Sequence, residues 1–198
     1  KAPIRTDVPE AMEQAKRMGI DVKICTGDNR GTAVGIGTEA GLVNGDFNTY
    51  EGSEVHEISD AQISDLKILA RSKPMDKHKL VTRLKEINSN RCIAVTGDGT
   101  NDAPAMKVSQ CGVSMGNATS IAKQTADVIL VDNSFASLIK GIIWGRNIFR
   151  NIRKFITFQL TINVSAVASS IICPLLGLDA PFTIVQMLWI NIIMDTLA

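Results

Sequence analysis

Two segments of the sequence run from an apolar stretch directly into the tripeptide Thr-Gly-Asp. The first contains Thr26, Gly27 and Asp28, and the second is the longer run Thr96-Gly97-Asp98-Gly99-Thr100-Asn101-Asp102. In an open parallel sheet, ligands bind at the carboxyl ends of the strands, where glycine allows close backbone approach and free amides face an anion. The two loops therefore predict one shared phosphate site.

The two loops offer different kinds of ligand. The hydroxyl of Thr26 and the amide of Gly27 are neutral donors that suit phosphoryl oxygens. Asp98 and Asp102, with Asn101 between them, offer carboxylate and amide oxygens, which suit a hard cation such as Mg²⁺. A lone Thr-Gly-Asp is most often only a turn, whereas the longer run at a strand end is much more specific. We expect phosphate at the first loop and Mg²⁺ at the second.

Lys77 lies between the two loops, in a segment that predicts a turn followed by a helix beginning near Met75 or Asp76. A cation in the first turn of a helix is unfavourable for the helix dipole. Lys77 is therefore better explained if it faces an anion at the phosphate site. A solvated surface lysine is the alternative.

The part of the chain from Val8 to about Leu130 alternates helical stretches with short β-branched runs, which predicts an α/β domain around a parallel sheet. An amphipathic helix with proline in its first turn is expected from Pro9 to Arg17, ended by Gly19. Residues 44–60 are expected to form a loop or small excursion. The expected strands are Asp21–Cys25, Arg91–Thr96, Cys111–Met115 and Asp127–Val131.

The composition changes after Lys154, because no lysine or arginine follows it. One long helix is expected from Ser134, basic at first and apolar from Phe155 to Leu176. About 22 residues at 1.5 Å each are enough to cross a bilayer core of about 30 Å. A turn over 177–181 and a second apolar run over 182–198 then predict a transmembrane hairpin.

The basic residues that precede the first span place the α/β domain in the cytosol by the positive-inside tendency, since the turn carries none. A buried helical pair in a soluble protein is the alternative.

The near-neutral charge and few aromatics argue against nucleic-acid binding. The dispersed cysteines suggest neither a zinc site nor a disulfide framework. The abrupt start and the apolar end predict a piece of a longer protein, without a signal peptide.

Asp195 lies in the second apolar run, where an ionisable residue is a functional-site candidate by default. Asn191 lies four residues earlier, on the same helical face. Asn163 comes about 12 Å into the first span, and Asp195 about 20 Å into the second from the opposite side, so their depths are similar. The three residues predict a ligand cluster for a transported ion. The alternative for Asn163 is that it merely forms a hydrogen bond between helices.

The Thr-Gly-Asp loops and Lys77 resemble the later motifs of the haloacid-dehalogenase-like phosphotransferases, in the form used by P-type ATPases. The resemblance covers essentially the whole chain, including Asp127–Asp132. It implies that an upstream aspartate in an Asp-Lys-Thr-Gly-Thr motif, absent from this sequence, attacks the γ-phosphate of ATP. The roles it implies are phosphate binding by Thr26, Gly27 and Asp28, phosphoryl stabilisation by Lys77, Mg²⁺ binding by Asp98, and support of metal and phosphate by Asn101 and Asp102.

Residues 158–164 and 186–198 resemble the fifth and sixth membrane helices of calcium pumps, closest to the plasma-membrane type. Ala166 stands where endoplasmic-reticulum-type pumps have a glutamate, which implies one transported Ca²⁺ rather than two. The implied fold is a Rossmann-like parallel sheet of the haloacid-dehalogenase type. The expected domains are the C-terminal part of a phosphorylation domain (1–133), a stalk helix (134–154) and the hairpin (155–198).

The expected protein is thus part of an integral membrane enzyme of the plasma membrane or an internal membrane, which uses ATP and Mg²⁺. Its partners would be the lipid bilayer and the remaining domains and helices of the parent pump. Without the nucleophile and a nucleotide-binding domain, the fragment alone is expected to be inactive. A pump for another cation and a soluble phosphatase of the same superfamily are the alternatives.

Overall fold

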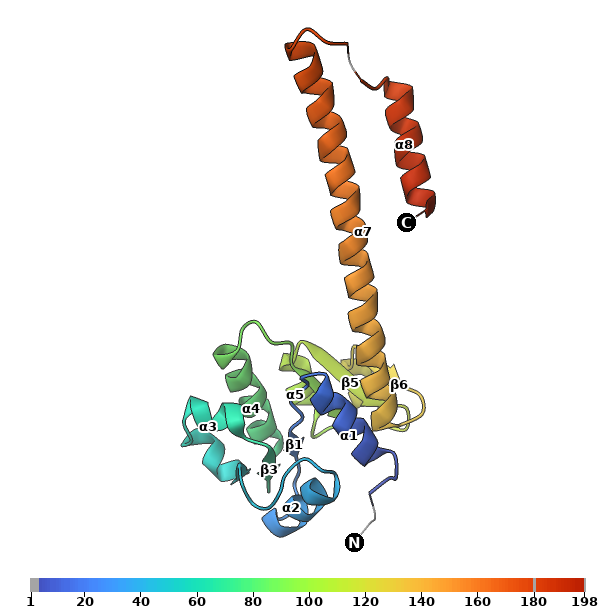
Figure 1. The fold of residues 1–198 in the computed structure, drawn as a ribbon. Coiled ribbons are helices and arrows are strands. Elements are labelled where there is room, and N and C mark those ends of the chain that lie inside the picture. Colours follow the sequence, from blue (N-terminus) through green and yellow to red (C-terminus); the bar gives the residue numbers. More distant parts are fainter. Residues whose placement is uncertain (1–3, 180, 198) are drawn as a thin grey trace. The chain divides into compact units, whose positions relative to one another are not determined.

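The computed structural model describes residues 4–179 and 181–197 of the chain. They form two compact units, which divide between residues 140 and 141. Figure 1 shows short strands and helices in the first unit and helices in the second. The predicted change from α/β to helical structure is therefore confirmed.

Neighbouring strands in the first unit are parallel, which confirms the predicted type of sheet. They form two three-stranded sheets, with the orders β1-β3-β2 and β4-β5-β6. Strands β1 and β4 are therefore edge strands. The strands are β1 (Ile24–Cys25), β2 (Thr49–Glu51), β3 (Ile68–Ala70), β4 (Ala94–Gly97), β5 (Cys111–Met115) and β6 (Val128–Leu130).

Strand β5 has the predicted bounds, and β1, β4 and β6 are shorter than predicted or shifted. Strands β2 and β3 were not predicted, and residues 44–60, expected to form a loop or small excursion, contain β2 and a 3₁₀-helix. Strand β3 is only three residues long, yet it is the central strand of its sheet and completely buried. Such a short apolar run does not distinguish a strand from part of a helix by its pattern.

The core of the first sheet is built on the two faces of β3. Leu69 packs in a cluster with Val55, Ile63, Leu66 and Leu80. Its neighbours in β3 point to the opposite face, as successive strand residues do. That face is a second cluster, made of Ile68, Ala70, Ala33 and Val43.

The helices of the first unit begin with α1, which has Pro9 in its first turn and ends before Gly19, as predicted. Gly19 has φ +67°, a conformation that glycine adopts without steric cost. Helix α4 begins at Pro74, close to the predicted start. The elements are α1 (Val8–Arg17), α2 (Arg30–Glu39), the 3₁₀-helix η1 (Gly52–His56), α3 (Asp60–Asp65), α4 (Pro74–Ile87), α5 (Ala103–Val108) and α6 (Ser120–Thr125).

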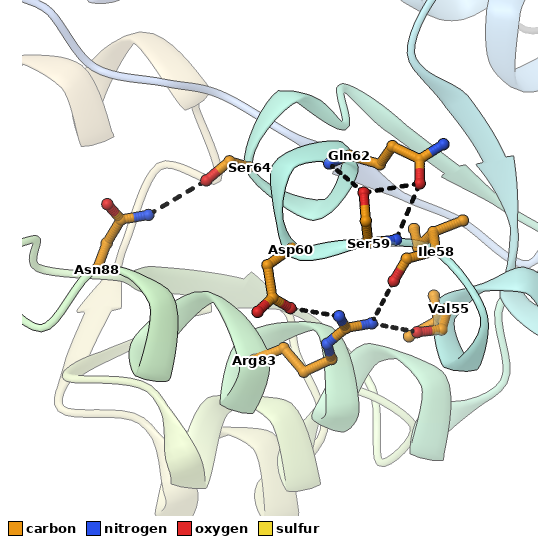
Figure 2. Close-up of polar contacts among 8 residues, drawn as sticks. All are labelled: Val55, Ile58, Ser59, Asp60, Gln62, Ser64, Arg83 and Asn88. Carbon is orange, nitrogen blue, oxygen red and sulfur yellow. Dashed lines mark hydrogen bonds and ion pairs between the residues drawn. The ribbon is translucent and has the colours of Figure 1, made fainter.

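Arg83 on α4 fastens the segment around η1 to that helix, as Figure 2 shows. Its Nη1 donates to the carbonyl oxygens of Val55 and Ile58, both at 2.9 Å, and its Nη2 contacts the carboxylate of Asp60. A guanidinium presents several donors in a fixed planar arrangement. One side chain therefore holds η1, the loop after it and the start of α3 against α4.

Helix α7 (Phe135–Leu175) is 41 residues long and begins within the first unit, where Ile139 is buried. Gly177, with φ +76°, ends it in a Schellman motif: its amide bonds the carbonyl of Pro174, and the Leu178 amide bonds that of Cys173. The long helix and the following turn agree with the prediction, although Ala180 of the predicted turn lies outside the described residues.

Helix α7 is the one helix in the described ranges that is long and apolar enough to cross a membrane. The second helix, α8 (Ile184–Leu197), is apolar but has only 14 residues. A helix is therefore present in the apolar run predicted over 182–198, and Ala198 lies outside the described residues.

Candidate phosphoryl-transfer site

The first predicted loop follows β1 and turns back on itself. The amide of Thr26 extends the sheet by bonding the carbonyl of Leu69 at 2.9 Å, and the amide of Asp28 bonds Thr26 Oγ1 at 3.1 Å. The carbonyl of Asp28 accepts from the amide of Arg71 at 2.8 Å. Asn29 then caps α2 by accepting from the amide of Thr32 at 2.9 Å. These bonds place Thr26 and Gly27 at the carboxyl end of β1, as predicted.

The second loop follows β4 and depends on the absence of a side chain at Gly97. A Cβ there would lie 2.4 Å from Cβ of Asp102 and 3.0 Å from Sδ of Met106. Gly97 thus lets α5 approach the end of β4 closely. The carbonyl of the next residue, Asp98, accepts from the amide of Thr119 at 2.9 Å. This bond fixes the backbone of Asp98, whose side chain is exposed.

Lys77 joins the two halves of the site. Its Nζ lies 2.7 Å from Oδ1 of Asp102, and both side chains are only 17% exposed. Lys77 comes from the first turn of α4, whose Leu80 shares a buried cluster with Leu69 of β3. Asp102 occupies the N-cap position of α5, after β4, without a capping hydrogen bond. The solvated-lysine alternative therefore does not describe Lys77, because its ammonium is held against a carboxylate in a sheltered position.

Cys25, the last residue of β1, lies close to this ion pair. Burial raises the pKa of its thiol to about 11, and the nearby cations of Lys77 and Lys23 only partly oppose that effect. The thiol therefore stays protonated at neutral pH and is a poor nucleophile. The polar and charged groups available to a ligand at the end of β1 are therefore those of the loop and Lys77, and not the thiol of Cys25.

The acidic residues of the second loop suit a divalent cation that also binds phosphate. Asp98 presents an exposed carboxylate, and Asp102 already uses one oxygen for Lys77. Over residues 4–179 and 181–197, no three His, Cys, Asp or Glu side chains gather in a way that could hold a metal ion. Mg²⁺ typically takes one or two protein carboxylates and completes its shell with water and substrate phosphate. The donor set fits that kind of site.

The predicted ion ligands occupy the second unit. Asn163 lies in α7 beside an open depression of about 350 Å³, which is otherwise lined by Val164, Val167 and Ala168. Asn191 is exposed on α8. The backbone of Asp195 lies in the same helix, four residues further on. The predicted cluster of these three residues stays a prediction.

Within the first unit, the structure brings Lys77 and Asp102 into contact and places Thr26, Gly27, Asp98 and Asn101 on the loops around them. The sequence did not predict that the lack of a side chain at Gly97 allows the close approach of Asp102. It also did not predict a role for Ser72, whose amide and Oγ both bond the carbonyl of Thr26 at 3.0 Å. The short spacing from Ser72 to Lys77 was the only signal in the sequence for a serine at the site.

The family model for haloacid dehalogenase-like hydrolases matches residues 1–109, which include both loops and Lys77. A solved structure of a zinc-transporting PIB-type ATPase in the E2.Pi state is similar to the chain with a TM-score of 0.69 and 31% identity. That match covers 99% of this chain and 26% of the other. The predicted fold is therefore confirmed.

Curated relatives match the whole chain at higher identity. Plasma membrane calcium-transporting ATPase 1 of Mus musculus is 43% identical, over 99% of this chain and 18% of the relative. Calcium-transporting ATPase 3, plasma membrane-type, of Oryza sativa subsp. japonica is 44% identical, over 100% of this chain and 20% of the relative. The chain thus spans about a fifth of the length of these relatives.

Proposed function

Because the chain belongs to the haloacid dehalogenase-like hydrolase family, we propose that it is the phosphoryl-transfer and ion-binding part of an ATP-driven calcium pump. The observation that carries the proposal is the Lys77–Asp102 ion pair at the meeting point of two strand-end loops. Such a site offers donors, a cation and carboxylates to one phosphoryl group. The calcium-transporting relatives support the choice of transported ion.

Each residue of the site has a role in this proposal. The Thr26 hydroxyl and Gly27 amide bind phosphoryl oxygens, with Asp28 closing the loop, and Lys77 balances their charge in the transition state. Asp98 holds Mg²⁺, which would neutralise further charge on the phosphoryl oxygens. Asp102 orients Lys77 and faces the metal, while Asn101 supports the loop between the two aspartates.

The phosphorylated aspartate lies in a part of the parent protein outside this sequence. Strands β1 and β4 both lie at sheet edges, and both end at the proposed site. An edge strand has unpaired backbone groups that accept another strand. We therefore place the upstream segment along these edges, where a parallel strand brings its own carboxyl end, and the aspartate on it, to Lys77.

The second unit supplies ion ligands in this proposal. Asp195, Asn191 and Asn163 contribute one carboxylate and two amide oxygens, whereas Ca²⁺ takes six to eight oxygens. Other helices of the parent, backbone carbonyls or water supply the rest. Ala166 has no ligand oxygen in its side chain, so one Ca²⁺ moves per cycle. Two occluded Ca²⁺ per phosphorylation site in the intact parent would contradict this count.

In this proposal, helix α7 couples phosphoryl transfer in the first unit to ion binding in the second. Its start is tied to the first unit, because Ser134 Oγ donates to Asp7 at 2.7 Å and Arg5 donates to the carbonyl of Asn133 at 2.7 Å. Its later part has the length and composition of a membrane span. The phosphorylation unit lies in the cytosol and α7 enters a bilayer, of the plasma membrane or an internal membrane.

Cation-dependent phosphorylation of the intact parent tests this function. With ATP and Mg²⁺, added Ca²⁺ should produce an acid-stable phosphoenzyme, and Zn²⁺, Na⁺ or K⁺ should not. Phosphorylation that depends on another of these cations would identify a different pump. A parent that forms no phosphoenzyme but hydrolyses small phosphomonoesters in solution would instead be a phosphatase.

A further inference from the structure

The carbonyl of Thr26, in the first loop of the site, has two donors from the same distant residue. The amide and the hydroxyl of Ser72 each reach it at 3.0 Å. Ser72 is 8% exposed and lies between β3 and α4. Two hydrogen bonds from one residue fix the direction of a carbonyl more firmly than one bond does.

The direction of that carbonyl determines the direction of the next amide. The described peptide bonds are trans, so the Thr26 carbonyl and the Gly27 amide lie in one peptide plane and point in opposite directions. The amides of Thr26 and Asp28 each donate to an acceptor in the chain. Among the described residues, no acceptor bonds the amide of Gly27. The amide of Gly27 is thus the donor in this loop that is left for a ligand. Because Ser72 holds the Thr26 carbonyl, the Gly27 amide points away from Ser72.

Ser72 is in turn held by the elements around it. The amide of Arg71, which has φ +47°, donates to the carbonyl of Asp28 at 2.8 Å. On the other side, a Cβ on Gly52 would lie 2.9 Å from Cα of Ser72 and 2.5 Å from Oδ2 of Asp76. The Gly52 backbone therefore presses directly against the segment that leads into α4.

The same packing connects Ser72 to Lys77. Gly52 begins η1, and Arg83 fastens η1 to α4 (Figure 2). Asp76, in the first turn of α4, bonds the amide of Lys73 at 2.8 Å and so fixes the helix start immediately after Ser72. The loop that presents the Gly27 amide and the helix that presents the Lys77 ammonium therefore share one support.

We propose that Ser72 is a positioning residue for phosphoryl transfer, which aims the Gly27 amide at the phosphoryl group and keeps the loop in register with Lys77. The inference rests on the proposed function and deepens it. Ser72 does not touch the phosphoryl group itself. Its hydroxyl acts through the Thr26 carbonyl, so its loss weakens phosphate binding without removing a ligand of phosphate or metal.

Phosphorylation of the intact parent by inorganic phosphate, without Ca²⁺, tests Ser72 directly. Loss of one neutral hydrogen bond, in Ser72→Ala, should weaken the apparent phosphate affinity about fivefold. Ser72→Cys, of similar shape but with a weak donor, should behave like Ser72→Ala. Ser72→Thr keeps the hydroxyl and should stay within about twofold of wild type. The Ca²⁺ affinity should not change in any of the three.

Ser109→Ala is the matched control, because its hydroxyl also donates to a backbone carbonyl, that of Met106 at 2.7 Å, but at the far end of α5. It should leave the phosphate affinity unchanged. Wild-type affinity in both Ser72→Ala and Ser72→Cys, or an equal loss in Ser72→Thr, overturns the inference. Asp98→Ala in the same assay separates the two hypotheses: if it still forms phosphoenzyme, the proposed function itself is wrong.

Discussion

The two units of the chain differ in how their candidate functional residues are held. In the first unit, Lys77 is paired with Asp102 at 2.7 Å, and the Thr26 carbonyl is bonded twice by Ser72. In the second unit, Asn163 lies beside an open depression, and most large apolar side chains of α7 and α8 are exposed. In the first unit, the described residues of the candidate site are held by partners within the unit, and only the proposed phosphorylated aspartate lies outside this sequence. The second unit presents exposed apolar surfaces and candidate ion ligands.

This difference has a physical basis in what each unit must bind. A phosphoryl group is highly charged, and oriented donors and cations stabilise it where they are already in place. Ca²⁺ needs six to eight oxygens, more than the side chains of two helices here provide. The phosphate site is therefore largely set by local contacts within this chain. In the proposed function, the ion site depends on helices from the rest of the parent.

Asp98→Ala should have the largest effect on the first unit and none on the second. In the intact parent it should abolish the phosphoenzyme from both ATP and inorganic phosphate, because Mg²⁺ loses a carboxylate while the phosphoryl charge remains. Acid-stable phosphoenzyme and Ca²⁺ binding should be measured in the same preparation. Normal phosphorylation at limiting Mg²⁺ would contradict the assignment of Asp98.

Lys77→Ala should slow phosphorylation about 100-fold, which is the usual cost of losing one group that stabilises charge in a transition state. The matched control is Lys85→Ala, an exposed lysine on the same helix, whose rate should equal that of wild type. Rapid-quench kinetics at saturating ATP measure both rates. If Lys77→Ala also matches wild type, the ion pair with Asp102 is only structural.

Gly97→Ala tests how tightly the second loop is packed. The new Cβ would lie 2.4 Å from Cβ of Asp102, so α5 or the loop must move. We expect a loss of about 1–3 kcal/mol in unfolding free energy, together with slower phosphorylation. Gly31→Ala is the control, since the nearest atom there would be 3.6 Å away. Equal unfolding free energies of the two variants would show that the second loop can rearrange without a loss of stability.

The thiol of Cys25 should have the smallest effect, visible only at high pH. Its pKa in the folded chain is about 11, above the ordinary value of 9.0, so the folded state binds the proton more tightly. The resulting stabilisation is present below about pH 9 and is lost as the pH rises towards 11. Thermal unfolding of wild type should therefore shift more between these pH values than that of Cys25→Ala. Parallel curves would show that the thiol is not buried in solution.

Much of the phosphate site could be predicted from the sequence, because Thr26 and Asp98 directly follow apolar runs that form edge strands. Lys77 was predictable from its unfavourable place in a first helical turn. Ser72 was not, since its role depends on a carbonyl 46 residues away that only the fold brings near. Strand β3 was missed for a similar reason: its three residues are central because β1 and β2 pair on either side of it.

Phosphorylation of the intact parent carrying Asp195→Asn, assayed in both directions, tests the central claim that this chain joins phosphoryl transfer to calcium binding. The variant should lose Ca²⁺-dependent phosphorylation by ATP, because the ion site loses its carboxylate. It should retain phosphorylation by inorganic phosphate, which uses Thr26, Lys77 and Asp98 and needs no transported ion. Ca²⁺-dependent phosphorylation at the wild-type Ca²⁺ concentration, or loss of both reactions in a folded variant, would contradict the account.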